Sequence, residues 1–122
     1  MSNGSLPRIL VVDDELHIRE TVSTWFYRRG FHVRVAENGE RAVAVCAEEA
    51  FDVLLIDMEM PVMNGTDAIK KIRALHPEMP ILVFSGFSAS IQEAAEIGVD
   101  RILQKPLSLR DLEREVRACL AN

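Results

Sequence analysis

The middle of the chain reads Val53-Leu54-Leu55-Ile56-Asp57, four apolar residues that end in a carboxylate. Two further stretches have the same uninterrupted apolar character, namely Ile9-Leu10-Val11-Val12 and Ile81-Leu82-Val83-Phe84. Short runs of this kind are typical of strands that are covered on both faces of a parallel sheet. We therefore expect three fully buried strands at the centre of the fold.

Two other strand-like segments are more polar. Apolar and polar residues alternate in Phe31-His32-Val33-Arg34-Val35, and polar residues flank the short segment Arg101-Ile102-Leu103-Gln104. Both patterns are typical of strands with one side in water. These segments are predicted to form the edges of the sheet.

Segments of helical periodicity separate the strands. Four apolar stripes recur at helical spacing: Ile18, Val22, Trp25 and Phe26; Ala42, Val43, Cys46 and Ala50; Ala68, Ile69 and Ile72; and Leu109, Leu112, Val116 and Leu120. A weaker fifth stripe over 88–97 comprises Ile91, Ala94 and Ala95. Gly30 and Gly98 are placed to end helices, and Ser108 to cap the last one. The charged run 110–117 is most simply a solvated helix face.

The alternation of strands and helices predicts the topology. About five β–α units imply an α/β fold with a parallel sheet between two layers of helices. If the second and fifth strands are edges, right-handed crossovers favour the strand order 2-1-3-4-5. This is the three-layer, doubly wound, five-stranded arrangement called flavodoxin-like. Its switch point, where a ligand crevice is expected, lies between the first and third strands.

Length and charge limit the possible functions. With 122 residues, the chain is predicted to form one domain over 1–122, with a core from about 8 to 120. A net charge of -5 argues against direct nucleic-acid binding by this domain. Neither a membrane-length apolar run nor a signal-peptide pattern at 1–5 is visible, so a cytoplasmic location is expected. Cys46 and Cys119 are predicted to be buried thiols rather than a disulfide or metal pair.

Chemically active side chains follow four of the predicted strands. Asp13 and Asp14 come after the first strand, Asp57 ends the third, Ser85 ends the fourth, and Lys105 follows the fifth. The carboxyl ends of parallel strands lie at one edge of the sheet, so these groups are expected to converge there. Taken singly, each has an ordinary interpretation as a helix cap or turn residue. Their combination, each at the correct strand end, makes coincidence improbable.

The chemistry of these residues favours a divalent cation and a phosphoryl group. Clustered carboxylates repel one another unless a cation lies among them, and Mg²⁺ prefers carboxylate and phosphate oxygens. The Lys105 ammonium and the Ser85 hydroxyl could neutralise phosphoryl oxygens. The remaining carboxylate could attack phosphorus and become an aspartyl phosphate.

From Arg8 to Leu120 the chain resembles a response-regulator receiver domain of two-component signal transduction. Four motifs carry the resemblance: Val11-Val12-Asp13-Asp14-Glu15, Asp57-Met58-Glu59-Met60-Pro61-Val62-Met63-Asn64-Gly65, Ser85-Gly86 and Lys105-Pro106. The resemblance implies a signalling switch that catalyses only its own phosphorylation and dephosphorylation. The phosphoryl donor would be a sensor histidine kinase or a histidine phosphotransfer protein. A downstream effector or a fused output domain would respond, without nucleic-acid or membrane contact by this domain.

The resemblance also assigns roles to individual residues. Asp57 would be the phosphoacceptor, and Ser85 and Lys105 would hold the phosphoryl oxygens. Mg²⁺, or Mn²⁺ in its place, would bind Asp14, Asp57 and the backbone carbonyl of Glu59 directly, and Asp13 through water. Further implied features are room for the donor at Gly86, a cis Lys105-Pro106 bond, and a loop after the phosphoacceptor shaped by Pro61 and Gly65.

Three positions depart from the common receiver pattern or add to it. Ile102 stands where many receivers have an aromatic residue that turns inward on activation. The usual coupling through serine and an aromatic ring is therefore in doubt, and we expect loop rearrangement to carry the change. Glu59 could favour the metal, or could repel or orient an attacking water. Phe87 could shield the phosphoryl group.

Other classes of protein remain as alternatives. An aspartate-based phosphatase would share the acid-x-acid pattern of Asp57-Met58-Glu59, but it normally places its nucleophile on an early strand. A pseudo-receiver would bind partners without phosphorylation. A flavin-binding protein would want a glycine-rich phosphate loop where Asp13 and Asp14 stand. Within the leading interpretation, the chain is either a single-domain regulator or the receiver of a longer protein.

Overall fold

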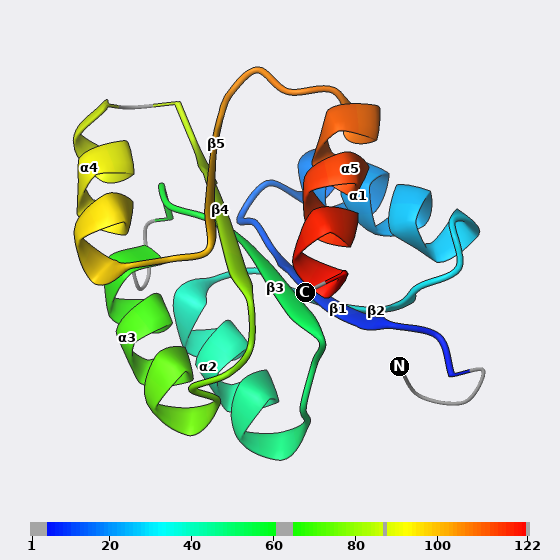
Figure 1. Ribbon diagram of the computed structural model, residues 1–122, viewed down its shortest axis with the longest axis horizontal. Helices are drawn as coiled ribbons and strands as arrows, with labels where there is room; N and C mark the ends of the chain where they lie inside the picture. The colour runs from blue at the N-terminus through cyan, green and yellow to red at the C-terminus, as the bar shows by residue number, and fades with distance from the viewer. Residues whose placement is uncertain (1–4, 61–64, 87, 122) are drawn as a thin grey trace.

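The computed structural model describes residues 5–60, 65–86 and 88–121. Strands and helices alternate along this part of the chain (Figure 1). The strands are β1 (Arg8–Val12), β2 (His32–Ala36), β3 (Val53–Asp57), β4 (Ile81–Ser85) and β5 (Arg101–Gln104). The helices are α1 (Leu16–Arg28), α2 (Gly39–Glu48), α3 (Gly65–Leu75), α4 (Ser88–Ile97) and α5 (Leu109–Leu120). In the described residues, these helices all lack the length and apolar character that crossing a membrane requires.

The sheet has the predicted order, β2-β1-β3-β4-β5, and all its neighbouring strands are parallel. Figure 1 shows α1 and α5 on one face of the sheet and α2, α3 and α4 on the other. The register places Val12 opposite both Ala36 and Ile56, and Asp57 opposite Phe84. The strands therefore end almost level, and the residues that follow them meet along one rim of the sheet.

Strand β3 is the centre of the core and is buried along its whole length. Leu54 and Ile56 pack with the helices α2, α3 and α4, whereas Val53 and Leu55 pack with α1 and α5. Full burial of one such side chain stabilises the fold by about 1.5–3 kcal/mol. These contacts on both faces fix β3 firmly, and with it the position of Asp57 at its end.

The helix ends follow the predicted signals. Gly30 and Gly98 adopt positive φ angles of 93° and 86°, which a residue without a Cβ accepts without strain. The hydroxyl of Ser108 accepts a hydrogen bond from the backbone N–H of Asp111 at 3.0 Å and so caps α5. These three residues set the ends of α1 and α4 and the start of α5.

Two alanines predicted on apolar faces are instead exposed. Ala50 lies beyond α2, because Glu49 adopts an extended conformation with φ -137° and ends the helix. Ala95 lies within α4, but only its neighbour Ala94 is fully buried. Helix α4 packs over β4 and β5 at the edge of the sheet, so the stripe that it buries is narrower than the sequence pattern suggested.

Both cysteines are buried free thiols, as predicted. Burial raises the pKa of the Cys46 thiol to about 11, so it remains protonated at neutral pH. A protonated, buried thiol is a poor nucleophile and metal ligand. Cys46 therefore serves as a small apolar side chain in the core.

The charged run 110–117 is not wholly a solvated face, because Glu113 is buried with 8% of its side chain exposed. Its carboxylate joins α5 to α1 by accepting hydrogen bonds from Trp25 Nε1 at 3.0 Å and Arg117 Nε at 2.8 Å. Arg29 Nε lies 3.0 Å from the same carboxylate. Trp25, predicted as a core residue, is half-buried and points its N–H into this cluster.

The partners of Glu113 keep its carboxylate ionised. Burial alone would raise the pKa, but hydrogen bonds from Arg117, Arg29 and Trp25 outweigh it, and the pKa is lowered. A carboxyl group whose pKa is lower in the folded state stabilises the fold above its unfolded-state pKa. This contribution is present at neutral pH and is lost as the pH falls through the folded-state pKa.

The contacts of Glu113 predict a specific loss of stability. Glu113→Ala leaves a partly buried indole N–H and two guanidinium groups without their acceptor, so we expect the free energy of unfolding to fall by about 2–3 kcal/mol. The matched control is Glu115→Ala, which removes a more exposed ion pair with Arg101 and should cost less than about 1 kcal/mol. Urea unfolding followed by circular dichroism measures both. Equal losses in the two variants would contradict the role assigned to Glu113.

Candidate functional site

The predicted convergence of polar residues occurs at the carboxyl ends of the strands. Asp57 is the last residue of β3 and Ser85 the last of β4, while Asp13 follows β1 directly. The parallel register brings the ends of these strands side by side. Lys105 follows β5, and its backbone N–H donates to the carbonyl of Ser85 at 2.9 Å. The rim therefore gathers residues that are far apart in the sequence.

Three carboxylates form one cluster at this rim. Asp13, Asp14 and Asp57 each place an oxygen within 4.8 Å of the others. Asp13 and Asp57 are buried, whereas Asp14 is exposed. Asp13 is held in place because its Oδ1 accepts a hydrogen bond from the backbone N–H of Glu15 at 2.9 Å. The cluster has two fixed, desolvated acids and one that opens to solvent.

The environment makes ionisation of the buried acids costly. The pKa of Asp57 is raised to about 6, chiefly by burial and also by the charge of Asp13. The backbone N–H of Glu59 and the ammonium of Lys105 oppose this shift but do not cancel it. The pKa of Asp13 is raised as well, again mainly by burial. Burial, and to a smaller degree repulsion between neighbouring acids, therefore favours the protonated forms of Asp13 and Asp57.

A divalent cation fits this cluster. Hard cations such as Mg²⁺ bind carboxylate oxygens, and they favour the ionised acids that burial and mutual repulsion disfavour. Asp13, Asp14 and Asp57 offer three such oxygens close together. The donor set contains only oxygen atoms, which suits Mg²⁺ or Mn²⁺ better than softer metals.

Positive charge and hydrogen-bond donors lie on the other side of Asp57. Lys105 Nζ is 3.2 Å from Asp57 Oδ2, and it also lies 5.1 Å from the centre of the Phe84 ring. The bond between Lys105 and Pro106 is cis, as the resemblance implied. The remaining oxygen of Asp57, Oδ1, accepts the backbone N–H of Glu59 at 3.0 Å. Both oxygens of Asp57 are therefore oriented.

The side chain of Glu59 has contacts that the sequence did not predict. Its carboxylate accepts a hydrogen bond from Ser85 Oγ at 2.5 Å and another from the backbone N–H of Gly86 at 3.1 Å. Lys105 Nζ lies 3.9 Å from Glu59 Oε1. The sequence placed Glu59 near the site, two residues after Asp57, but only the structure shows which donors its side chain reaches. It also shows that the Gly86 N–H faces the site.

The loop after β3 depends on a close approach at Gly65. A Cβ on this residue would lie 2.8 Å from Met58 Cα, so any larger residue would force the backbone apart. Met58 is buried, as expected for a side chain that points into the fold. This contact supports the predicted role of Gly65 in shaping the loop. Pro61 and Phe87, which were also singled out, lie outside the described residues.

Ile102 occupies the position where many receivers have an aromatic residue. Ile102 lies in β5 opposite Val83 and is half-buried against the core layer formed with α2, α3 and α4. Its side chain already contacts the core and has neither a ring nor a hydroxyl to exchange between two environments. Ile102 therefore cannot act as an aromatic switch, and loop rearrangement stays a prediction for this chain.

The fold and the rim together define a small α/β domain with an acidic site at its switch point. The chain matches the family described as the response regulator receiver domain over residues 9–117. The chain therefore belongs to the family of response-regulator receiver domains. This agrees with the resemblance found in the sequence motifs.

Individual relatives give the same result. The chain is 38% identical over 112 residues to the autoinducer 1 sensor kinase/phosphatase LuxN of Vibrio campbellii, covering 90% of this chain and 13% of LuxN. It is 33% identical over 115 residues to the transcriptional regulatory protein CpxR of Klebsiella pneumoniae, covering 93% of this chain and 49% of CpxR. The chain therefore spans half or less of the length of these curated relatives.

A solved structure confirms the flavodoxin-like fold. The CheY-like response regulator receiver domain protein of Methanospirillum hungatei superposes with a TM-score of 0.91 at 28% sequence identity. The superposition covers 96% of this chain and 95% of that one. Near-complete coverage of both chains means that the sheet order and the helix layers are shared.

The raised pKa of Asp57 predicts how stability depends on pH when metal is removed. The fold disfavours the ionised form, so the destabilisation is complete above about pH 6 and disappears as the pH falls below the ordinary aspartate value of 3.8. In EDTA at about pH 7.5, Asp57→Asn should raise the free energy of unfolding by roughly 1–3 kcal/mol, and by much less at about pH 4. Urea denaturation of both proteins at the two pH values measures the difference.

The control for this prediction is Glu37→Gln, which removes one exposed charge just after β2 and should change stability much less. Adding Mg²⁺ at neutral pH should stabilise the native protein more than Asp57→Asn, because the variant lacks one carboxylate ligand. A gain from Asp57→Asn that is equally large at both pH values would rule out ionisation as its cause.

Proposed function

We propose that this receiver domain accepts a phosphoryl group on Asp57 from a phosphohistidine of a sensor kinase or phosphotransfer protein. The observation that supports this most directly is the buried Asp57 carboxylate, which lies close to Asp13 and Asp14 and also contacts Lys105. In the reaction, an oxygen of Asp57 forms a bond to phosphorus while the bond from phosphorus to the histidine nitrogen breaks. The electron pair of that bond stays with the imidazole. We propose that residues 1–122 act as one such domain.

Each residue of the rim has a proposed role in this transfer. Asp13, Asp14, Asp57 and the backbone carbonyl of Glu59 would hold Mg²⁺, which supplies neutralisation of the phosphoryl charge when bound. Lys105 and Ser85 would stabilise phosphoryl oxygens from the other side. Gly86 is exposed, and, its chain neighbours aside, the nearest described atom to a Cβ built there would be Lys105 Cδ at 4.0 Å. We propose that the donor approaches past this small residue.

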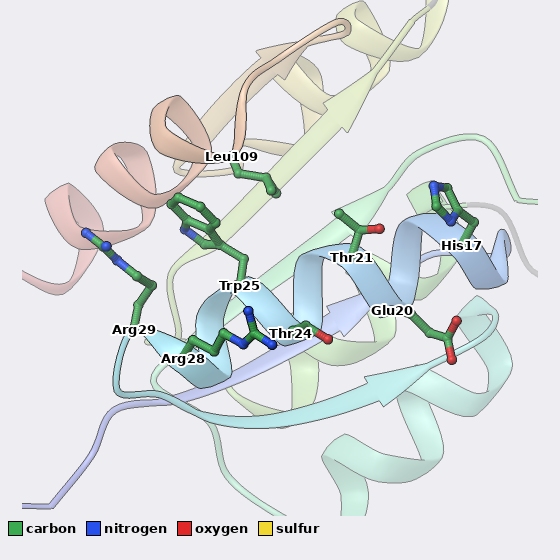
Figure 2. Close-up of a pocket in the computed structure, with 8 residues that line it drawn as sticks. All are labelled: His17, Glu20, Thr21, Thr24, Trp25, Arg28, Arg29 and Leu109. Atoms are coloured by element: carbon green, nitrogen blue, oxygen red, sulfur yellow. The ribbon is translucent and has the colours of Figure 1, made fainter.

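The face of α1 offers a place for a protein donor to bind. A groove there is lined by His17, Thr21, Trp25 and Leu109, among others, and Figure 2 shows Leu109 lying across from the α1 side chains. Helix α1 starts beside the acidic cluster, and Arg19 donates to the carbonyl of Asp13 at 2.9 Å. A donor seated on α1 would therefore lie next to the rim that holds Asp57.

The output is proposed to be a signal rather than a product. Phosphorylation of Asp57 changes charge and hydrogen bonding at one point, which can shift a conformational equilibrium that a partner detects. We propose that the domain does not act on outside substrates, and that a downstream effector or a fused output domain responds. Transcriptional regulation by CpxR is one form that such an output takes in a relative.

The first test is phosphorylation by a small donor. Incubation with acetyl phosphate should add a single phosphoryl group that requires Mg²⁺, because the rim needs a cation to offset its negative charge. Asp57→Asn should show none, and intact-mass spectrometry distinguishes the species. If the native chain gains no adduct and binds no stable phosphoryl mimic such as beryllofluoride, the chain is a pseudo-receiver.

A second test separates a switch from a phosphatase. With Mg²⁺ and a chromogenic phosphate monoester, we expect no sustained turnover, because the proposed function limits the chemistry to the phosphoryl group that Asp57 itself carries. Continuous release of the chromophore, lost in Asp57→Asn, would establish an enzyme instead. Circular dichroism of the variant confirms that it remains folded.

A further inference from the structure

The carboxylate of Glu59 lies among the groups proposed to bind the phosphoryl oxygens. It accepts hydrogen bonds from Ser85 Oγ and the Gly86 N–H, and it lies 3.9 Å from Lys105 Nζ. Its backbone N–H donates to Asp57 Oδ1, so the residue is anchored directly beside the phosphoacceptor. The side chain is only 23% exposed. Glu59 therefore occupies a defined place at the rim rather than extending into solvent.

These donors are the ones that a phosphoryl group on Asp57 would need. The Ser85 hydroxyl, the Gly86 N–H and the Lys105 ammonium are all suited to an anionic oxygen. A carboxylate and a phosphoryl group both present negatively charged oxygens, and one donor hydrogen cannot serve both fully. The two anions would also repel each other at such short range. Occupation by Glu59 and occupation by a phosphoryl group are thus mutually exclusive.

A role for the Glu59 side chain as a metal ligand fits less well. The group of carboxylate oxygens close enough to share a cation, among the described residues, consists of Asp13, Asp14 and Asp57. The Glu59 carboxylate is instead directed to the hydroxyl, amide and ammonium donors.

We propose that Glu59 is a built-in occupant of the phosphoryl-oxygen site, which holds Ser85, Gly86 and Lys105 until phosphorylation of Asp57 displaces it. This inference rests on the function proposed above and adds a means of regulating the same site. In the unphosphorylated domain the donors already have an anionic partner, which lowers the affinity for a phosphoryl group. On phosphorylation they exchange one anion for another, and the Glu59 carboxylate moves out.

The same exchange explains how a chain with Ile102 in place of an aromatic residue can switch. Ser85 is fully buried and already donates toward the rim, so it keeps an anionic partner in both states. The side chain that must relocate is Glu59, on the loop that follows β3. The phosphorylation-dependent change therefore begins at this loop, and no ring movement at position 102 is needed.

The experiment compares Glu59→Ala and Glu59→Gln with the native chain and with Glu15→Gln. Glu15 is an exposed carboxylate on the loop after β1, so this control removes one negative charge near the rim without touching the three donors. The probe is beryllofluoride with Mg²⁺, and ¹⁵N NMR titration gives its dissociation constant. Removing the occupant should tighten binding on the order of 10- to 100-fold in Glu59→Ala, as expected for charge-assisted hydrogen bonds. Glu59→Gln should give a smaller gain, and Glu15→Gln little.

The free proteins provide a second readout that needs neither metal nor phosphoryl mimic. The Gly86 amide proton should move upfield in Glu59→Ala, because it loses a carboxylate acceptor, and should stay in place in Glu15→Gln. Equal beryllofluoride affinity in the native chain and Glu59→Ala, or an equal gain in Glu15→Gln, would overturn the inference. Failure of every protein to bind beryllofluoride would instead overturn the proposed phosphorylation, whereas an unmoved Gly86 amide would count against the Glu59 contact itself.

Discussion

The desolvated carboxylate of Asp57 is the constraint around which the rim is organised. Strand β3 is buried on both faces, so the last residue of the strand cannot turn its charge fully into water. Burial raises its pKa to about 6. The charge of Asp13 adds to this shift, whereas Lys105 and the Glu59 N–H oppose it. Lys105 approaches one oxygen and the Glu59 N–H the other. The packing that stabilises the core thus makes ionisation of Asp57 unfavourable.

The charges around Asp57 are divided between two sides. Asp13 and Asp14 form an acidic side that a cation can complete, whereas Ser85 and Lys105 form a donor side that an anion can complete. Under the proposed function, a phosphoryl group on Asp57 together with Mg²⁺ would complete both sides at once. In the unphosphorylated chain, Glu59 supplies the anion from within the protein. Under the proposed exchange, the donor side would have an anionic partner in both states, and phosphorylation would change which anion that is.

Stability comes from parts of the fold that are remote from this chemistry. The Glu113 carboxylate joins α5 to Trp25 of α1 near the opposite end of the sheet from the acidic rim, and two arginines complete its hydrogen bonds. The two apolar layers on either side of β3 supply most of the burial. Such contacts can compensate for the loss of folding stability that the buried acids of the rim cause. Their contributions to the free energy of unfolding are largely independent of the site.

The sequence by itself determined the sheet order, the helix ends at Gly30 and Gly98, and the positions of Asp13, Asp57, Ser85 and Lys105 at one rim. Local periodicity identifies each strand and helix, and it acts over a few residues at a time. The general geometry of parallel sheets then places the carboxyl ends of all the strands at one edge. Tertiary structure decided the rest. Glu113 is buried because Trp25 of α1 and Arg29, the residue after that helix, pack against it. Ala95 stays exposed because α4 lies at the edge of the sheet. Glu59, on the loop after β3, reaches Ser85 and Gly86 at the end of β4. The direction of such a side chain depends on contacts between residues that are far apart in the sequence.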